Sequence, residues 1–390
     1  MTKAIKTQHR HYKFNTWFAY IATTITVLIA GFRLRDIAEY GGGGWVTGDW
    51  LINYSAGFIR RGLTGEIIFF ISPMGESAVT IVSITQFILI ATIQVSALIL
   101  FLQTPRTPIW LMIVFSPAAG LFGFLNPDAF MRKEIIPIAA IALMAIIFRA
   151  KLTPWFYTIP LLLLALGSFS HETSNFAVPA FLYLIFLEFK RHRFDSKTFG
   201  ILVSLVVIPA ALGLGLTVFS PGTSDQVTEL CSFFTDRDLD QMCAGPLTYL
   251  DDSLIDGMNQ VSAWFPNYLT YIPAIVLAAL PIALLRPNRS IWVLLLVTYA
   301  FLIPLFLSGI DYGRWIFLAT SLITFVLLAT SSQIQRGSVD VPLYAAILFI
   351  VLWLMPYTAN PDHRSVVYLV LDNPVNWTID YLARTLNPTE

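Results

Sequence analysis

The residues best suited to chemistry lie in one segment, positions 48–66. It holds an isolated acid, Asp49, two adjacent arginines, Arg60 and Arg61, and the aromatic residues Trp50 and Tyr54. Guanidinium groups bind phosphate oxygens in bidentate geometry, and a carboxylate in apolar surroundings gains the raised pKa that suits a general base. The segment therefore predicts an anion-binding site with Asp49 as a base beside it and the aromatic side chains as stacking surfaces.

These residues also have structural interpretations. Arg60 and Arg61 would serve as a basic anchor on lipid phosphates, and Asp49 as the N-cap of a helix that begins at Trp50. Basic anchors are less expected on the outer leaflet, where the topology below places this segment. We therefore favour ligand binding for the arginines, and both roles of Asp49 stay open.

Three further polar clusters lie at tight joints between apolar stretches. Ionisable groups at the boundary of a membrane are costly and are usually functional. We expect these clusters to line a water-filled cavity, with the histidine cluster as a second candidate for the base and the other two as substrate-binding groups. The clusters are Arg132 with Lys133, His171 with Glu172, and Asp311 with Arg314.

Each cluster has a structural alternative as well. Arg132 and Lys133 would also fit as ordinary interfacial charges. Asp311 and Arg314 have the i, i+3 spacing of an ion pair within a helix. A lone histidine such as His171 is often a hydrogen-bonded structural residue. The argument for function depends on the expectation that all the clusters lie on one side of the membrane.

The elements that must position these residues are membrane-spanning helices. The chain of 390 residues is 56% hydrophobic and 12% charged, with a mean hydropathy of +0.70. A helix needs about 20 apolar residues to span the bilayer core. The sequence predicts an all-α bundle of about eleven spans that forms one integral membrane domain over residues 1–390. The stretches lie near 15–33, 77–103, 108–125, 134–149, 154–170, 175–189, 199–219, 266–285, 290–308, 313–331 and 341–357.

The distribution of charge predicts the orientation of these spans. With a cytoplasmic N-terminus, the cytoplasmic segments hold 14 Lys and Arg residues against three acids, and the outer segments hold 10 against 21. This asymmetry follows the positive-inside rule. It places the outer loops 34–76 and 220–265 and the tail 358–390 outside. The basic start lacks a signal-peptidase site, so we expect the first span to be a retained anchor.

The outer loop 220–265 contains both cysteines of the chain, Cys231 and Cys243. In an oxidising compartment this spacing predicts a disulfide, with two free thiols as the alternative. The alternating acids Asp236, Asp238 and Asp240 lack the glycine and glutamate of a calcium loop, so we interpret them as a solvated acidic face. We predict no metal site, no cofactor and no nucleic-acid binding.

The predicted topology resembles that of the GT-C superfamily of membrane glycosyltransferases and of bacterial O-antigen or capsule polymerases. The resemblance rests on a long polar first outer loop with an acid, about ten further spans and outer arginines. It implies a polyprenyl-(pyro)phosphate sugar donor held by the arginines, a glycan or lipid-linked acceptor, and Asp49, or His171 with Glu172, as the base. The chain departs from the paired acids that GT-C loops often carry, because Trp50 follows Asp49.

Two other functions fit the same residues. A flippase or transporter of a lipid-linked or anionic sugar would use the arginines for binding, but needs polar groups on both faces. A membrane acyltransferase modifying surface glycans would need acyl-binding residues on the cytoplasmic face. The cytoplasmic segments offer few such residues, so we favour glycosyl transfer or polymerisation in a bacterial inner membrane, among membrane lipids and other polysaccharide-assembly proteins.

Overall fold

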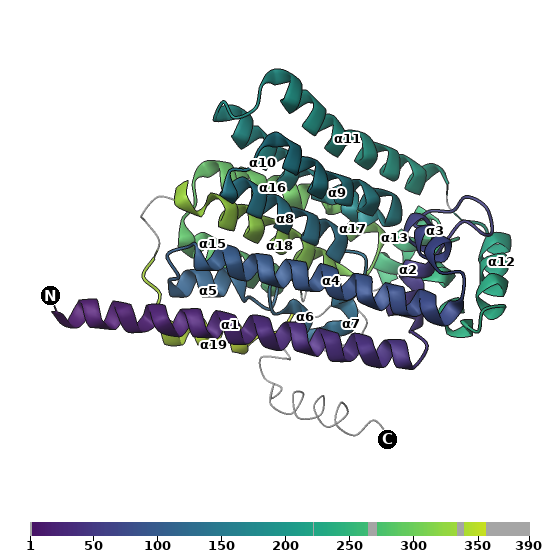
Figure 1. Cartoon of the computed structure of the whole chain (residues 1–390), viewed down its shortest axis with the longest axis horizontal. Coiled ribbons are helices and arrows are strands. Elements are labelled where there is room, and N and C mark those ends of the chain that lie inside the picture. The colour runs from purple at the N-terminus through teal and green to yellow at the C-terminus, as the bar shows by residue number, and fades with distance from the viewer. Residues whose placement is uncertain (1, 221, 264–270, 334–338, 356–390) are drawn as a thin grey trace.

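The computed structural model of the chain describes residues 2–220, 222–263, 271–333 and 339–355. Every regular element within these residues is a helix, as the sequence predicts. The long helices lie side by side along one direction, and several short helices gather at one end (Figure 1). The α-helices are α1 (Thr2–Glu39), α2 (Asp49–Leu51), α3 (Leu63–Ile71), α4 (Gly75–Leu102), α5 (Pro108–Val114), α6 (Phe122–Leu125), α7 (Pro127–Phe130), α8 (Ile135–Ala150), α9 (Thr158–Ser170), α10 (Val178–Lys190), α11 (Ser196–Phe219), α12 (Ser224–Thr235), α13 (Leu254–Ala263), α15 (Tyr271–Leu285), α16 (Arg289–Phe301), α17 (Ile303–Ser308), α18 (Tyr312–Thr330) and α19 (Leu343–Val351).

Short helical turns connect several of these elements. A π-helical turn, η1 (Gly44–Gly48), leads into α2, and a 3₁₀ turn, η3 (Glu172–Ala177), joins α9 to α10. The remaining turns are η2 (Pro154–Tyr157), η4 (Asp240–Cys243), η5 (Gly245–Tyr249) and η6 (Ser331–Gln333).

Five helices in the described part of the chain are long and apolar enough to cross a membrane, which identifies the chain as an integral membrane protein. They are Tyr12–Glu39 of α1, α4, α11, α16 with α17 (Arg289–Ser308), and α18. Ile135–Ala150, Pro154–Ser170 and Tyr271–Leu285 are apolar but shorter. The tail 358–390 and the expected span residues 266–270 and 356–357 lie outside the described residues.

One expected span is broken. The stretch 108–125 forms α5, which ends at Val114, and the single turn α6, which begins at Phe122. Between them the amide of Gly120 donates to the carbonyl of Val114 at 2.9 Å. A Cβ on Gly120 would lie 2.3 Å from that carbonyl oxygen, so this tight turn requires glycine. The hydrophobic length of 108–125 was therefore a poor guide to its helical length.

Helix α18 lies at the centre of the bundle, whereas α1 and α11 lie at its two edges (Figure 1). All residues of α18 from Gly313 to Thr330 are buried, and they include small residues such as Ala319 and Ser321. Small residues let helix backbones approach closely within a membrane. Helix α11 fully buries only Leu202, Val206, Ala210 and Gly213, as expected for a helix that faces lipid on one side.

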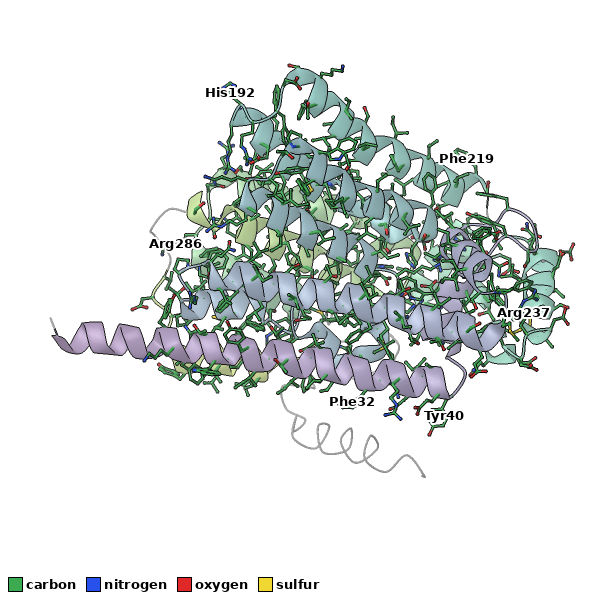
Figure 2. All side chains as sticks on the ribbon, in the orientation of Figure 1. Phe32, Tyr40, His192, Phe219, Arg237 and Arg286 are labelled. Carbon is green, nitrogen blue, oxygen red and sulfur yellow. A yellow bond between two sulfur atoms is a disulfide. The ribbon has the colours of Figure 1, made fainter. Side chains whose placement is uncertain are left out.

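The two ends of the bundle differ in structure. Figure 2 shows His192 and Arg286 at the end where the chain begins, and Tyr40, Phe219 and Arg237 toward the other end. Residues 40–74 and 222–263, which contain α2, α3, α12 and α13, gather at this second end (Figure 1). We call it the loop end.

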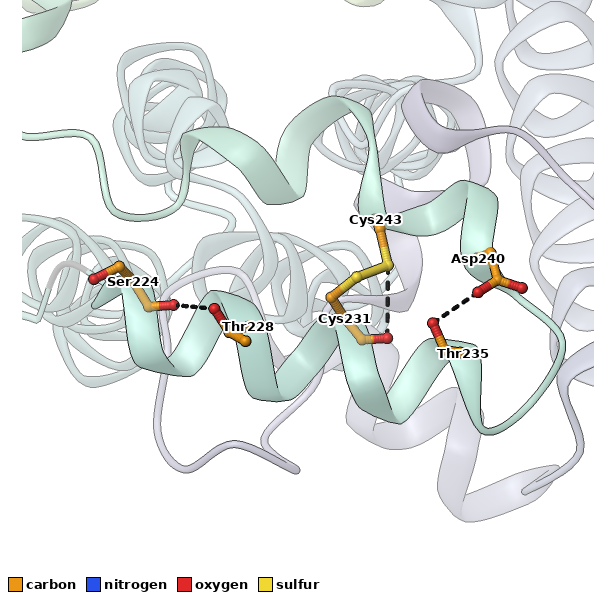
Figure 3. Close-up of a disulfide and its surroundings, with 6 residues drawn as sticks. All are labelled: Ser224, Thr228, Cys231, Thr235, Asp240 and Cys243. Atoms are coloured by element: carbon orange, nitrogen blue, oxygen red, sulfur yellow. Dashed lines mark hydrogen bonds between the residues drawn. A yellow bond between two sulfur atoms is a disulfide. The ribbon is translucent and has the colours of Figure 1, made fainter.

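A disulfide between Cys231 and Cys243 closes the turn after α12 (Figure 3), as the spacing of the cysteines predicts. Asp240, one of the three alternating acids, accepts a hydrogen bond from Thr235 at 2.7 Å within this turn. The side-chain amide of Gln241 donates to the carbonyl of Gly41 at 2.6 Å. The disulfide-closed turn thus rests on the glycine run that precedes Asp49.

Candidate functional site

Asp49 is the first residue of α2 and is completely buried. The N-cap position belongs to Gly48, so the alternative of Asp49 as an N-cap is wrong. Neither carboxylate oxygen of Asp49 has a hydrogen-bond partner among the described residues. Helix α3 packs on this segment at Gly65, where a Cβ would lie 2.1 Å from the carbonyl oxygen of Ile52.

Two buried side chains fix the position of the segment that carries the Arg132–Lys133 cluster. The carbonyl of Met131 accepts hydrogen bonds from the indole of Trp50 at 2.9 Å and from the amide of Gln86, on α4, at 2.7 Å. Trp50 is only 1% exposed. The expected role of Trp50 as a stacking surface for a sugar is therefore corrected: its ring is inaccessible, and it anchors the site.

Arg132 is the cation closest to Asp49. Its Nε lies 3.6 Å from Oδ2 of Asp49, and its guanidinium lies over the ring of Trp45, 5.1 Å from the centroid. The Arg132 side chain is 9% exposed, and its Nε has no hydrogen-bond partner in the described part of the chain. Arg132 thus has fewer close polar partners than the other buried arginines described below.

Burial alone would raise the pKa of Asp49, but Lys133 and Arg132 outweigh it and hold this pKa well below its usual value. The expected rise of the pKa in an apolar environment is therefore wrong. Asp49 is ionised at neutral pH, which makes it ready to accept a proton but a weak base.

Arg61 and Glu172 form a buried ion pair that joins the first loop to η3. Nε of Arg61 donates to Oε2 of Glu172 at 2.8 Å, and Nη2 makes a close ion pair with Oε1. Burial opposes the charge on Glu172, but Arg61 lowers its pKa well below the usual value. Arg61 adopts a φ of 69°, which non-glycine residues rarely adopt, and its contacts hold it there.

Lys133 connects three segments of the site. Its Nζ is fully buried and donates to the carbonyls of Arg61 and Ser170, each at 3.0 Å. Burial lowers the pKa of Lys133 to about 8, although Asp49 opposes this shift. Lys133 therefore joins the segments of the site and contributes to the positive potential at Asp49. It is not an interfacial charge.

Arg314 is neutralised by two carboxylates. Nη1 donates to Glu134 at 2.7 Å, and Nη2 makes a close ion pair with Asp311. The i, i+3 pair that the sequence allowed as an alternative is therefore present. Glu134 extends it to the start of α8, so Arg314 ties two helices together.

His171 lines a cavity and is 4% exposed. Its Nδ1 faces two donors of Thr173, the backbone amide at 3.3 Å and the hydroxyl at 2.7 Å. Because an amide can only donate, Nδ1 is the acceptor and the neutral ring carries its proton on Nε2. Burial lowers the pKa of His171 despite the neighbouring Glu172. In this tautomer His171 donates a proton from Nε2, which disfavours its expected role as a base.

The cavity has a volume of about 310 Å³ including its mouth. It lies between the first loop, the end of α9 and the end of α11. One guanidinium nitrogen of Arg60, Nη2, donates to the carbonyl of Tyr249 at 2.6 Å. The lining residues are Tyr54, Phe58, Ile59, Arg60, Arg61, Ser168, Phe169, His171, Glu172, Gly213, Leu216 and Thr217.

The structure thus brings the first loop and all three clusters into one buried network at the loop end. Trp50 supports this network from inside, and Arg60 and Tyr54 lie at the cavity. Sequence reasoning placed Glu134 beside Arg132 and Lys133 but assigned it no role in the site. It also missed Gly213, Leu216 and Thr217 of α11, because these residues lie within an uninterrupted apolar stretch.

No group of three or more His, Cys, Asp or Glu side chains within the described residues is arranged to hold a metal ion. No protein-family model, curated protein or solved structure matches the chain.

Proposed function

We propose that the chain is a membrane glycosyltransferase or polysaccharide polymerase that uses a polyprenyl-(pyro)phosphate sugar donor at its extracytoplasmic face. The observation that carries this proposal is the buried charge network at the loop end, beside a cavity. Four of its cations are Arg61, Arg132, Lys133 and Arg314, and four carboxylates face them. Burying such a network costs free energy, which is why buried charges of this kind are usually functional. A site that stabilises a leaving phosphate would be such a function.

The orientation belongs to the same proposal. A chain that crosses the bacterial inner membrane about eleven times would place the loop end in the periplasm, since the positive-inside rule assigns the opposite end to the cytoplasm. Two features support this assignment. His192 and Arg286, from two basic connections, lie at the same end of the bundle as the N-terminus (Figure 2). The disulfide lies at the loop end, and disulfides persist in oxidising compartments.

Arg132 is the cation that we assign to the donor phosphate. Arg61 and Arg314 already hold carboxylates at hydrogen-bond distance, whereas Arg132 reaches Asp49 only at 3.6 Å. A phosphate would offer Arg132 the bidentate partner that Asp49 does not provide. Its binding would neutralise the charge that develops on the leaving phosphate.

Asp49 is the base that this arrangement favours, and because its side chain is fully buried it would become reachable when Arg132 moves away from it. As the bond between the anomeric carbon and the phosphate oxygen breaks, the phosphate leaves with the bonding electrons and the oxygen of the acceptor hydroxyl bonds to the anomeric carbon. The hydroxyl proton passes to a carboxylate. Glu172 is occupied by Arg61, whereas both oxygens of Asp49 lack hydrogen-bond donors among the described residues. Moving Arg132 from Asp49 to the phosphate would release the base as the donor binds.

The proposal is tested by the surface polysaccharide of cells that carry Arg132→Ala or Arg132→Lys at equal membrane expression. We expect glycan length or amount to fall at least about a hundredfold in both, because lysine retains the charge but not the bidentate geometry. Arg237→Ala is the matched control, since this partly buried arginine of the loop end contacts only Phe233 and the backbone carbonyls of Pro73 and Phe233 among the described interactions, and no carboxylate of the network. Normal glycan in Arg132→Ala cells would contradict the proposal.

A further inference from the structure

Helix α3 is too short to cross a membrane, yet the face that it turns away from the bundle is apolar. Its nine residues rise about 14 Å. Ile67, Phe70 and Ile71 are 40%, 89% and 63% exposed, and their spacing of three and four residues places them on one face. Met74, which follows the helix, is 73% exposed. A group of large apolar side chains at the surface marks an interaction site.

The other side chains of α3 fix this orientation. Ile68 is buried against the bundle. The ring of Phe69 packs edge-on against Phe233 of α12, with centroids 5.0 Å apart. Oε2 of Glu66 accepts a hydrogen bond from the backbone amide of Tyr54 at 3.1 Å, so the acid of this helix is turned toward the first loop. The bundle, α12 and the first loop thus hold α3 with its apolar face outward.

Helix α3 lies across the end of the bundle. It contacts both α4 and α9, which lie on opposite sides of α8 (Figure 1). A helix that reaches both must cross the end of α8 instead of running along it. This is the orientation of a helix that lies in the membrane interface, in the plane of the bilayer.

Helix α4 sets the level of α3 relative to the bilayer. Its 28 residues rise about 42 Å, which matches the about 40–45 Å of a bilayer with its headgroups. Because α4 begins at Gly75, directly after Met74, α3 lies at headgroup level. Glu76 and Thr80 are exposed, and the next exposed residue of α4 is Ile84. The boundary with the acyl chains therefore lies within about two turns of the start of α4.

Helix α12 provides the contrast. It packs against α3 at the same end of the bundle, but every exposed residue within it is polar. Such a surface is expected of a helix that faces water, so the apolar face of α3 is not a general property of the loop end. The exposed residues of α12 are Ser224, Asp225, Thr228, Glu229, Ser232 and Thr235.

We infer that α3 is an interfacial helix whose exposed face, formed by Ile67, Phe70 and Ile71, lies in the lipid leaflet at the loop end. The apolar surface continues on the membrane-spanning helix α11, whose last residue, Phe219, is 85% exposed at the same end (Figure 2). A protein partner would need more surface. With Met74, four side chains of at most about 200 Å² each only just reach the about 800 Å² that each partner buries in a standard interface, and none of the four is fully exposed.

The inference does not depend on the proposed function, but it has a consequence for the first loop. Gly62 is the N-cap of α3, so Arg61 directly precedes the helix. Insertion of α3 would hold the first loop, and the charge network that Arg61 joins, at the level of the headgroups. A phosphate carried by a lipid lies at this level.

The test is EPR spectroscopy of nitroxide labels on the full chain in lipid nanodiscs. Both native cysteines form the disulfide, so an introduced cysteine is the only free thiol. Phe70→Cys and Ile67→Cys report on the exposed face of α3. Thr228→Cys on α12 is the matched control for water, and Ile84→Cys on α4 is the reference for lipid. All four side chains are exposed, so the variants should fold.

Molecular oxygen concentrates among acyl chains, whereas a nickel chelate stays in water. We expect the ratio of oxygen to nickel collision rates to be at least about threefold higher in Phe70→Cys and Ile67→Cys than in Thr228→Cys. Both ratios should approach that of Ile84→Cys.

Two results would overturn the inference. A ratio in Phe70→Cys and Ile67→Cys equal to that of Thr228→Cys would place the face in water, and low collision rates with both reagents would show that protein covers it. The proposed function fails separately, through normal surface glycan in Arg132→Ala cells, and that result would leave α3 in the leaflet.

Discussion

A buried carboxylate lies near each end of the bundle, and the two have different surroundings. Glu188, at the end opposite the loop end, is fully buried and pairs with Arg191 at 3.0 Å and Arg193 at 2.7 Å. Both arginines reach the surface. Asp49 is equally buried, but its nearest cation, Arg132, lies 3.6 Å away and is itself buried.

This difference separates stability from function. A buried carboxylate with two close ion pairs is what a folded chain needs to keep that carboxylate inside. Asp49 is instead held ionised by surrounding cations without direct hydrogen bonds from the described residues, which leaves it available for another partner. We therefore expect the Glu188 cluster to carry stability and the Asp49 cluster to carry activity, and the following experiments can break that contrast.

The largest expected effect comes from neutralising each carboxylate in turn. Asp49→Asn should lower sugar transfer by about 10²–10⁴-fold, as loss of a general base does. It should lower the free energy of unfolding less than Glu188→Gln does, because Asp49 has one ion pair at 3.6 Å and no hydrogen bond among the described residues. Glu188→Gln should leave transfer intact but lower the free energy of unfolding by about 3 kcal/mol, because it breaks buried ion pairs. Thermal unfolding in detergent measures the stability of each variant, and the amount of surface glycan measures transfer. Lost transfer in Glu188→Gln with normal transfer in Asp49→Asn would refute the contrast.

The disulfide should have the next largest effect, and only at the loop end. Replacing Cys231 and Cys243 by serine should lower stability by about 3 kcal/mol, the chain-entropy estimate for a loop of this size. Amide hydrogen exchange should then speed up in 40–48 and 231–245, because Gln241 holds Gly41. Exchange near Glu188 should stay unchanged. Equal acceleration at both ends would show that the disulfide supports the whole bundle.

The smallest expected effect is a pH dependence from Lys133, whose pKa is about 8 in the folded chain. Transfer should fall about tenfold per pH unit above 8, because Lys133 loses its proton and the positive charge beside the phosphate site at Arg132 decreases. Stability should change in the opposite direction. The unfolded state binds more protons between pH 8 and 10.5, so the free energy of unfolding rises with pH there.

Lys133→Arg sharpens this test, because arginine stays charged at every pH used. The alkaline loss of activity should disappear in this variant, whatever its absolute rate. An alkaline loss at the same pH in Lys133→Arg would assign the titration to another group.

The sequence predicted the helical class, the disulfide and the residues of the charge network because each leaves a local signal. Apolar length marks helices, two cysteines in one polar loop mark a bridge, and charges at helix ends are costly enough to stand out. Clustering of Asp49, Arg132, His171 and Arg314 followed from their expected position on one side of the bundle.

The partners of each charge were not predictable, because they depend on three-dimensional packing. From the sequence, Arg61 and Arg314 were predicted to bind phosphate. In the structure they form ion pairs with Glu172 and Glu134. Trp50 was predicted to stack on a sugar ring. It is buried instead, because the chain packs tightly at Gly65 and the indole donates a hydrogen bond to the carbonyl of Met131. The residues of α11 that line the cavity have no distinguishing pattern in the sequence, since their position depends on close helix packing at Gly213.

The central claim is that transfer occurs at the loop end, on the outer face, and it is tested most directly by the leaflet in which unused donor accumulates. In cells with Asp49→Asn, lipid-linked sugar should accumulate in the outer leaflet, where a membrane-impermeant oxidant reaches it in spheroplasts. If the lipid-linked sugar is instead protected from the oxidant and trapped in the inner leaflet, the chain is a transporter and the catalytic roles assigned to Asp49 and Arg132 are wrong.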